Sequence, residues 1–254
     1  MSTNIGRRTL AFVAAGIVAG AASSATAALV FTGSSGAKSA SVKFEQSGSQ
    51  LFVTLANTST ADATVPTDIL TAVFFNFKVN PNLSPVSAVL GGGGTVFYSA
   101  SQPAGGVVGG EWGYGAGLSG APKGDAYGIS SSGLNIFGQP TFPGGNLAGP
   151  AALDGLQYGI TTAADNPATG NGGITGNALI KNSVVFTFNI QNPSFALELG
   201  SVKDVVFQYG TSLTEPSFDG FAPVPEPGTA LAGAMVLLPF ALSTLRSVRK
   251  IGKR

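Results

Sequence analysis

The chain of 254 residues contains no cysteine and no histidine, and charged residues make up only 10% of it. Without cysteine the chain has neither a thiol nucleophile nor a disulfide framework. Without histidine it has no Ser-His-Asp triad, and the lack of both residue types excludes the usual zinc sites. Carboxylates are therefore the remaining general acid–base groups, and a bound metal would need oxygen ligands, as calcium does.

Arginine is confined to the two ends of the chain, so the charges are segregated. Residues 28–225 hold six lysines, no arginine and 11 acidic residues, which gives this span a net charge of −5. Proteins that bind nucleic acid present a cationic surface to the phosphates. The acidic middle of this chain therefore predicts that it does not bind nucleic acid.

The first 27 residues have the three parts of a secretory signal peptide. Arg7 and Arg8 precede an apolar segment at residues 10–22, and the small residues Ala25 and Ala27 follow at the positions that a signal peptidase requires. The apolar segment would rise only about 20 Å as a helix, short of the ~30 Å core of a bilayer. We expect cleavage after Ala27. A retained anchor and a twin-arginine signal are the alternatives for this segment.

A second three-part signal occupies residues 222–254. Pro225, Glu226 and Pro227 precede 18 uncharged residues, 228–245, which would form about 27 Å of helix, enough to span a bilayer. A basic tail follows, and by the positive-inside rule it stays in the cytoplasm. Its charged residues are Arg246, Arg249, Lys250, Lys253 and Arg254.

This order of motif, helix and basic end resembles the PEP-CTERM sorting signal of Gram-negative bacteria. The resemblance implies recognition by an exosortase, a membrane enzyme that removes the tail near Pro225, Glu226 and Pro227. It also implies a protein of the cell surface or of an exopolysaccharide layer. An ordinary single-pass anchor is the alternative interpretation of the tail.

Between the two signals, hydrophobic and polar residues alternate, which is typical of strands with one buried face. The alternation predicts one mainly β domain at residues 28–221, an antiparallel β-sandwich of jelly-roll or immunoglobulin-like type, with helix only at residues 10–22 and 229–249. The two strongest runs should share a core through Val73, Phe75, Phe77, Val184, Phe186 and Phe188. Val79 is predicted to point inward with the first run. The alternating segments are residues 41–46, 50–57, 71–79, 183–191 and 204–209.

Residues 91–176 hold 25 of the 37 glycines, interleaved with large apolar residues. A disordered linker would lack such residues, so we expect long loops and short strands packed on the sheets. Parts of the middle resemble a recurring type of exosortase-dependent surface protein, for which no biochemical activity is implied. The similar stretches are residues 57–60, 109–112, 154–160 and 166–173.

The candidates for ligand chemistry are few, and each has a structural alternative. Glu111, Trp112 and Tyr114, with Tyr127, suggest a carbohydrate-binding platform if the rings are exposed, whereas core packing is the expected role of a lone tryptophan. A glycoside hydrolase would need two of the carboxylates to face each other across one pocket. Asp62 and Asp68 flank Pro66 and are expected to shape a turn.

Calcium is the metal candidate, because it takes oxygen ligands and needs no histidine. Asp165, Asn166 and Asn171, with Thr169, offer side-chain oxygens in a glycine-rich loop, although their spacing is not that of an EF-hand. Asx-turns are the expected role of these residues, and no cofactor is predicted. The leading hypothesis is a non-enzymatic, exported surface or matrix protein with a structural or adhesive role. A carbohydrate-binding module and, less favoured, a hydrolase are the alternatives.

Overall fold

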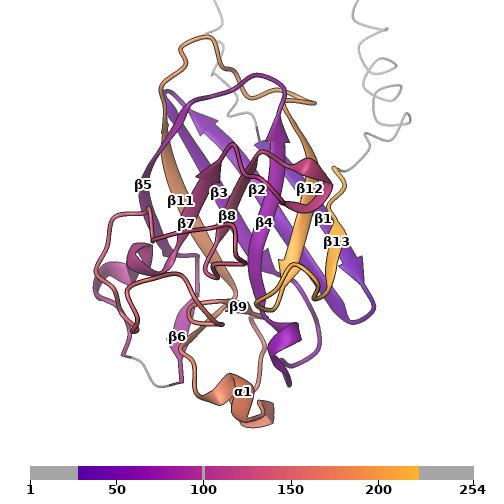
Figure 1. Cartoon of the computed structure of the whole chain (residues 1–254), viewed down its shortest axis with the longest axis vertical. Helices are drawn as coiled ribbons and strands as arrows, with labels where there is room; N and C mark the ends of the chain where they lie inside the picture. The colour runs from indigo at the N-terminus through magenta and orange to yellow at the C-terminus, as the bar shows by residue number, and fades with distance from the viewer. Residues whose placement is uncertain (1–27, 99–100, 223–254) are drawn as a thin grey trace, which may run out of the picture.

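The computed structural model describes residues 28–98 and 101–222, and these form a mainly β domain with antiparallel sheets (Figure 1). The predicted signal helix at residues 10–22 and the predicted membrane helix at 229–249 lie outside the described residues. Within the described ranges, no helix has the length and hydropathy needed to cross a membrane. The one α-helix in these ranges, α1, is Gly172–Thr175.

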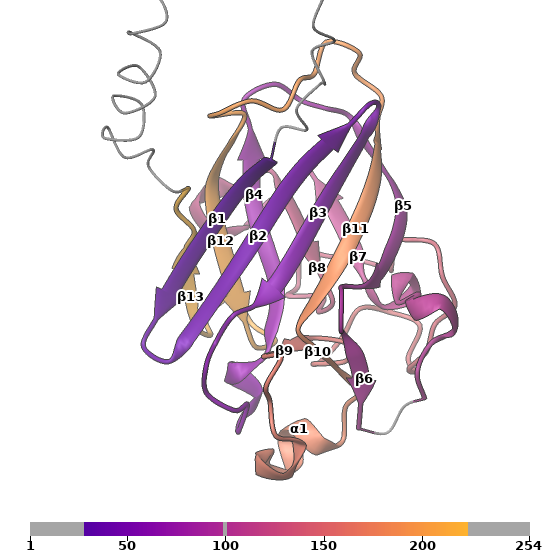
Figure 2. The ribbon, with the colours of Figure 1, turned by 180° about the vertical axis from the view of Figure 1, so that it is seen from behind.

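The first sheet has five strands in the order β1-β2-β3-β11-β5, and Figure 2 shows it in front. All of its neighbouring strands are antiparallel. Buried side chains alternate along β2, β3 and β11, which contain three of the predicted segments. The strand bounds are Ala28–Ser35 for β1, Lys38–Ser47 for β2, Gln50–Asn57 for β3, Ser183–Ile190 for β11 and Leu83–Leu90 for β5.

The second sheet has eight strands, with β4 at its centre. The order is β13-β12-β4-β9-β10-β6, and β4 also pairs with β8, which pairs with β7. One pair, β9 with β10, is parallel, and α1 lies in the connection between these two strands. The bounds are Leu70–Phe77 for β4, Thr95–Phe97 for β6, Gly113–Ala116 for β7, Tyr127–Ser130 for β8, Ile160–Thr161 for β9, Leu179–Lys181 for β10, Val202–Tyr209 for β12 and Ser217–Asp219 for β13.

The two sheets contribute to one hydrophobic core. As predicted, the β4 residues Val73, Phe75 and Phe77 and the β11 residues Val184, Phe186 and Phe188 belong to the same buried cluster. All but Phe77 have no exposed surface, and Phe77 is 9% exposed. The transfer of each phenylalanine side chain out of water contributes about 1.5–3 kcal/mol to folding.

The prediction that the strands are buried on one face only is wrong for β4. Ala72 and Phe74 point away from the first sheet but have no exposed surface. They form a second apolar cluster with Ala121 and Leu134, because the chain of the glycine-rich region folds over the outer face of β4. This region therefore forms loops and short strands packed on the sheets, as expected from its apolar residues.

The prediction that Val79 continues the inward face of β4 is also wrong. β4 ends at Phe77, and Val79 lies in the following loop with 47% of its surface exposed. The loop to β5 begins before the alternating pattern ends. The two connections 78–82 and 191–201 are hydrogen-bonded to each other at this end of the domain, for example from Lys78 N to Ser201 O at 2.9 Å.

Candidate functional site

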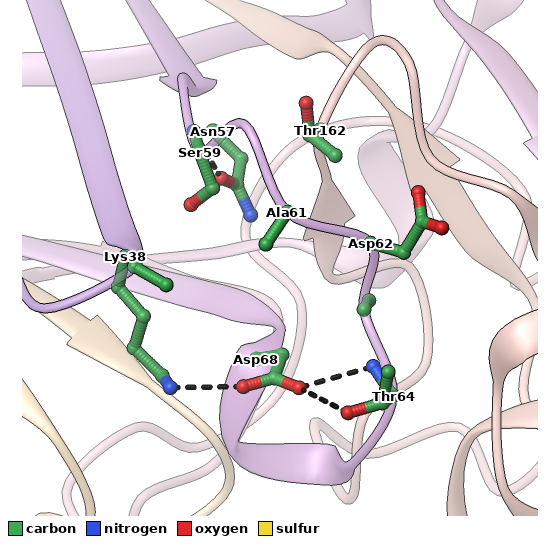
Figure 3. Close-up of a pocket in the computed structure, with 10 residues that line it drawn as sticks. Lys38, Asn57, Ser59, Ala61, Asp62, Thr64, Asp68 and Thr162 are labelled. Carbon is green, nitrogen blue, oxygen red and sulfur yellow. Dashed lines mark hydrogen bonds and ion pairs between the residues drawn. The ribbon is translucent and has the colours of Figure 1, made fainter.

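A pocket with several polar residues in its lining lies at the end of the domain where β3 ends and the chain turns toward the 3₁₀-helix Pro66–Asp68 (Figure 3). Its volume is about 290 Å³, near the lower end of the range for small-molecule sites. The residues that line it include both carboxylates that flank Pro66. They are Ala37, Lys38, Asn57, Ser59, Ala61, Asp62, Ala63, Thr64, Asp68 and Thr162.

Two residues that line this pocket, Lys38 and Asp68, form an ion pair. Lys38 Nζ, at the start of β2, lies 2.8 Å from Asp68 Oδ1. Asp68 Oδ2 accepts hydrogen bonds from the backbone N–H of Thr64 at 3.0 Å and from that of Val65 at 3.1 Å. Burial alone would raise the pKa of Asp68, but Lys38 and these backbone donors outweigh it and lower the pKa below 3.8. Asp68 therefore stays ionised and shapes the turn, as the sequence predicts.

A second set of polar groups in the pocket is satisfied by the protein itself. Asn57 Nδ2 donates to the carbonyl of Ile160 at 2.9 Å, and its Oδ1 accepts from Ser59 N at 3.1 Å. Tyr209 Oη donates to the carbonyl of Ser39 at 2.9 Å. The bond from Asn57 to Ile160 and the bond from Tyr209 to Ser39 connect the two sheets, so these groups contribute to the fold more than to ligand binding.

The two carboxylates of the pocket do not form an acid–base pair. Asp62 Oδ1 accepts from the backbone N–H of Asn166 at 3.0 Å, and Figure 3 shows the Asp62 carboxylate pointing away from Asp68. A glycosidase acid needs a raised pKa, whereas that of Asp68 is lowered. The pocket thus lacks the arrangement that the hydrolase hypothesis requires.

The proposed carbohydrate platform is not exposed. Trp112 has no exposed surface, Glu111 is 6% exposed, and the Trp112 ring packs against Phe186 with a centroid distance of 4.9 Å. Tyr114 is partly buried against the core, and its hydroxyl oxygen is buried. The rings are therefore not placed to stack on a sugar, and the core packing expected of Trp112 is confirmed. The loop at residues 139–148 and the first sheet enclose them.

Glu111 has a structural partner instead of a ligand. Its Oε1 accepts hydrogen bonds from the backbone N–H groups of Leu147 and Ala148, the latter at 2.8 Å. Burial raises the pKa of Glu111 more than these two bonds lower it. The carboxylate thereby holds the distant 145–150 loop against the 3₁₀-helix Gly109–Glu111.

The side chains proposed as calcium ligands also accept hydrogen bonds from backbone N–H groups. Asp165 is 3% exposed, and its Oδ1 accepts from Ala63 N at 2.7 Å. Asn166 Oδ1 caps the 3₁₀-helix Pro167–Thr169, and Asn171 Oδ1 caps α1 by accepting from Gly173 N at 2.9 Å. The two asparagines make the Asx-type contacts expected from the residue types, whereas Asp165 binds a distant segment of the chain. In residues 28–98 and 101–222, no group of three or more acidic side chains is placed to hold a metal ion.

A buried carboxyl group that the sequence did not indicate lies beside β4. Asp125 has no exposed surface, and its Oδ1 accepts from Asn76 Nδ2 at 2.6 Å while its Oδ2 has no partner. The same amide group lies 3.3 Å from Asp204 Oδ2. Burial, followed by the nearby charge of Asp204, raises the pKa of Asp125 to about 7. Its local sequence, Lys-Gly-Asp-Ala, gives no sign of burial.

The predicted sorting residues lie outside the part of the chain that the structure describes. This holds for the cleavage positions Ala25 and Ala27, for the motif at 225–227 and for the basic tail at 246–254. A scan against protein-family models, a search of the curated proteins and a search of the solved structures found no match to this chain.

Proposed function

We propose that this chain is an exported bacterial surface or matrix protein whose C-terminal tail is a PEP-CTERM sorting signal. The observation that carries the proposal is the order of features along the chain. A signal-peptide pattern precedes Ala28, and Pro225, Glu226 and Pro227 precede an uncharged 18-residue run and a basic end. The described strands and the pairing of Phe221 lie between the two patterns.

The tail acts as a stop for export and as a substrate for processing. Its five basic residues make passage through the bilayer costly, at about 2.5–3.5 kcal/mol for each charge placed at the centre. The uncharged run then halts in the inner membrane with Pro225 at its outer entrance. Proline at 225 and 227 keeps this entrance extended, which is the form that a protease binds. Exosortase, signal peptidase and the export machinery are the partners that this route requires.

The exported domain has a structural or adhesive role, and polysaccharide of the envelope is its proposed environment. We class the domain as an antiparallel β-sandwich, since two sheets contribute to one core. We propose that it is not an enzyme. This is supported by the candidate carboxylates Glu111, Asp68 and Asp165, which bind backbone groups of the domain itself.

The experiment is cell fractionation with intact-mass measurement, in strains with and without the exosortase. With the enzyme, the released protein should lack residues 1–27 and the tail beyond the 225–227 region. Without it, the form that keeps the tail should accumulate in the inner membrane. Changing Pro225, Glu226 and Pro227 to alanine should have the same effect as loss of the enzyme, while Pro193→Ala, in an exposed loop, should be processed normally. If the triple variant is trimmed and released like wild type, the motif is incidental and the tail is only an anchor.

A further inference from the structure

The first described strand and the last described residues are joined at the edges of the two sheets. Thr32 N donates to Phe221 O at 3.0 Å, and Phe221 N donates to Thr32 O at 2.8 Å, so the two residues form an antiparallel bridge. Gly33 permits the close approach beside it, because a Cβ atom there would lie 2.2 Å from the carbonyl oxygen of Asp219. We call this pairing of Thr32 with Phe221 the terminal clasp.

The clasp sets the direction of the chain at its last described residues. The bridge is antiparallel, so the chain at Phe221 runs in the opposite direction to β1. It therefore points toward the end of the domain where β1 begins, at Ala28. That end carries Ala28, which pairs with Glu45 near the turn 47–50. The loops 78–82 and 191–201 lie at the same end, and Leu197 N of the second loop donates to Gln46 Oε1 at 2.6 Å. It is the upper end in Figures 1 and 2.

The length of chain beyond the clasp limits how far this end is from the membrane. Six residues, 222–227, separate Phe221 from the uncharged run that starts at Gly228. Fully extended, they span at most about 20–25 Å, and about 13 Å of this is needed to draw level with Ala28. The surface of the bilayer would therefore lie within roughly 10 Å of this end while the tail is attached.

This end also exposes apolar side chains that have no role in the core. Leu199 is 71% exposed and Val79 is 47% exposed, the first in loop 191–201 and the second in loop 78–82. The only charged residues of the two loops are Lys78 and Glu198, so the loops carry no net charge. An exposed leucine on such a surface loses little by entering the headgroup region of a bilayer and gains by leaving water.

We propose that this end of the domain rests on the membrane before processing, with the Leu199 and Val79 side chains in contact with the lipid surface. The proposal rests on the proposed function, since it takes the tail to be a membrane anchor. The clasp supplies the orientation, and the two loops supply the contact. Cleavage at the 225–227 region then frees the domain, because two exposed aliphatic side chains alone bury too little surface to hold it.

The absence of cysteine allows a direct test on the full chain. Leu199→Cys, Val79→Cys and, as a control, Ala168→Cys, which lies at the opposite end beside α1, are each labelled with bimane. The proteins are reconstituted into vesicles of phosphatidylethanolamine and phosphatidylglycerol that contain a lipid with a spin label on its headgroup. We expect stronger quenching at 79 and 199 than at 168. A fourth protein carries Leu199→Cys and a Gly-Ser linker of about ten residues after Ala222, which adds about 17 Å of reach and should abolish the quenching.

Flotation of the vesicles separates this inference from the proposed function. Chains that float with the vesicles but show equal quenching at 79, 168 and 199 would overturn the inference and leave the anchor intact. Quenching at 199 that persists in the linker protein would overturn the role of the clasp. Chains that do not float overturn both the anchor and the contact.

Discussion

The rings of Trp112 and Phe186 lie edge to face, with their centroids 4.9 Å apart and an interplanar angle of 63°. Trp112 comes from the glycine-rich region, residues 91–176, and Phe186 from β11 of the first sheet. Phe142, which also comes from the glycine-rich region, contacts the same Phe186 ring at 5.1 Å. This contact shows that the glycine-rich region is part of the core and not an appendage to it.

Truncation of Trp112 should therefore destabilise the protein. We expect Trp112→Ala to lower the free energy of unfolding by about 3–5 kcal/mol, the usual cost of a large aromatic cavity. Trp112→Phe should cost much less, because the indole Nε1 has no hydrogen-bond partner to lose. Urea unfolding of the two variants measures both values. An alanine variant with the wild-type midpoint would contradict the assigned burial.

A charge placed in the core at β11 should prevent folding, whereas the same charge one residue later should not. Phe186 has no exposed surface, while Thr187 points to the other face and is partly exposed. An unpaired carboxylate is costly to bury, so Phe186→Asp should fail to accumulate as soluble protein. Thr187→Asp is the matched control and should accumulate normally, as measured by soluble yield. Equal yields of the two variants would show that the buried and exposed faces of β11 are wrongly assigned.

Removal of the Glu111 carboxylate should loosen the 145–150 loop. Glu111→Ala leaves the N–H groups of Leu147 and Ala148 without their acceptor, which should cost about 1.5–3 kcal/mol. Glu111→Gln keeps an oxygen at the same place and should cost less. Urea unfolding gives the stabilities, and limited proteolysis should show faster cleavage near residue 147 in the alanine variant only. The same cleavage rate in both variants would contradict this role.

Asp125 should make stability depend on pH. In the folded protein its pKa is raised from 3.8 to about 7, so the folded state binds a proton that the unfolded chain has released. The contribution of this group to the free energy of unfolding is therefore fully present below about pH 4, falls as the pH rises and is lost above about pH 7. The full contribution is on the order of a few kcal/mol. The groups that act on it are Asp204, Lys123, Asp219 and Lys203.

The test of this prediction is Asp125→Asn, which cannot ionise. The variant should be more stable than wild type at pH 8, and the difference should shrink toward pH 4. Glu198→Gln, which changes an exposed carboxylate, is the control and should follow the wild-type profile. Urea unfolding between pH 4 and 8 measures the three profiles, and parallel curves for wild type and Asp125→Asn would refute the assignment.

Strand positions could be predicted from the sequence because alternation is a local property. Residues 50–57 were expected as one strand, and β3 spans Gln50–Asn57. Residues 183–191 were expected as another, and β11 spans Ser183–Ile190. The order of residues within such a strand shows which side chains share the buried face and which share the other face. The shared core of β4 and β11 was also predictable, since the two most apolar faces are the ones that gain most by facing each other.

The covering of the outer face of β4 could not be predicted in this way. Phe74 is as apolar as its inward neighbours, but its burial depends on Ala121 and Leu134, which come from a different part of the chain. Core packing of Trp112 was expected from its residue type, but the local sequence does not show that Phe186 is its neighbour. Local patterns identify which residues are apolar, and only distant contacts decide whether water reaches them.

The sequence by itself determined the period of the strands, the segregation of charge and the two terminal signal patterns, all of which depend on residues close together in the chain. The tertiary structure alone decided which carboxylates are buried and what they bind. Asp125 is buried because Asn76 of β4 and the bulged strand with Asp204 meet around it. Asp68 stays ionised because Lys38 of β2 reaches it. Burial and ion pairing are sums over neighbours in space, and those neighbours are set by the packing of the sheets.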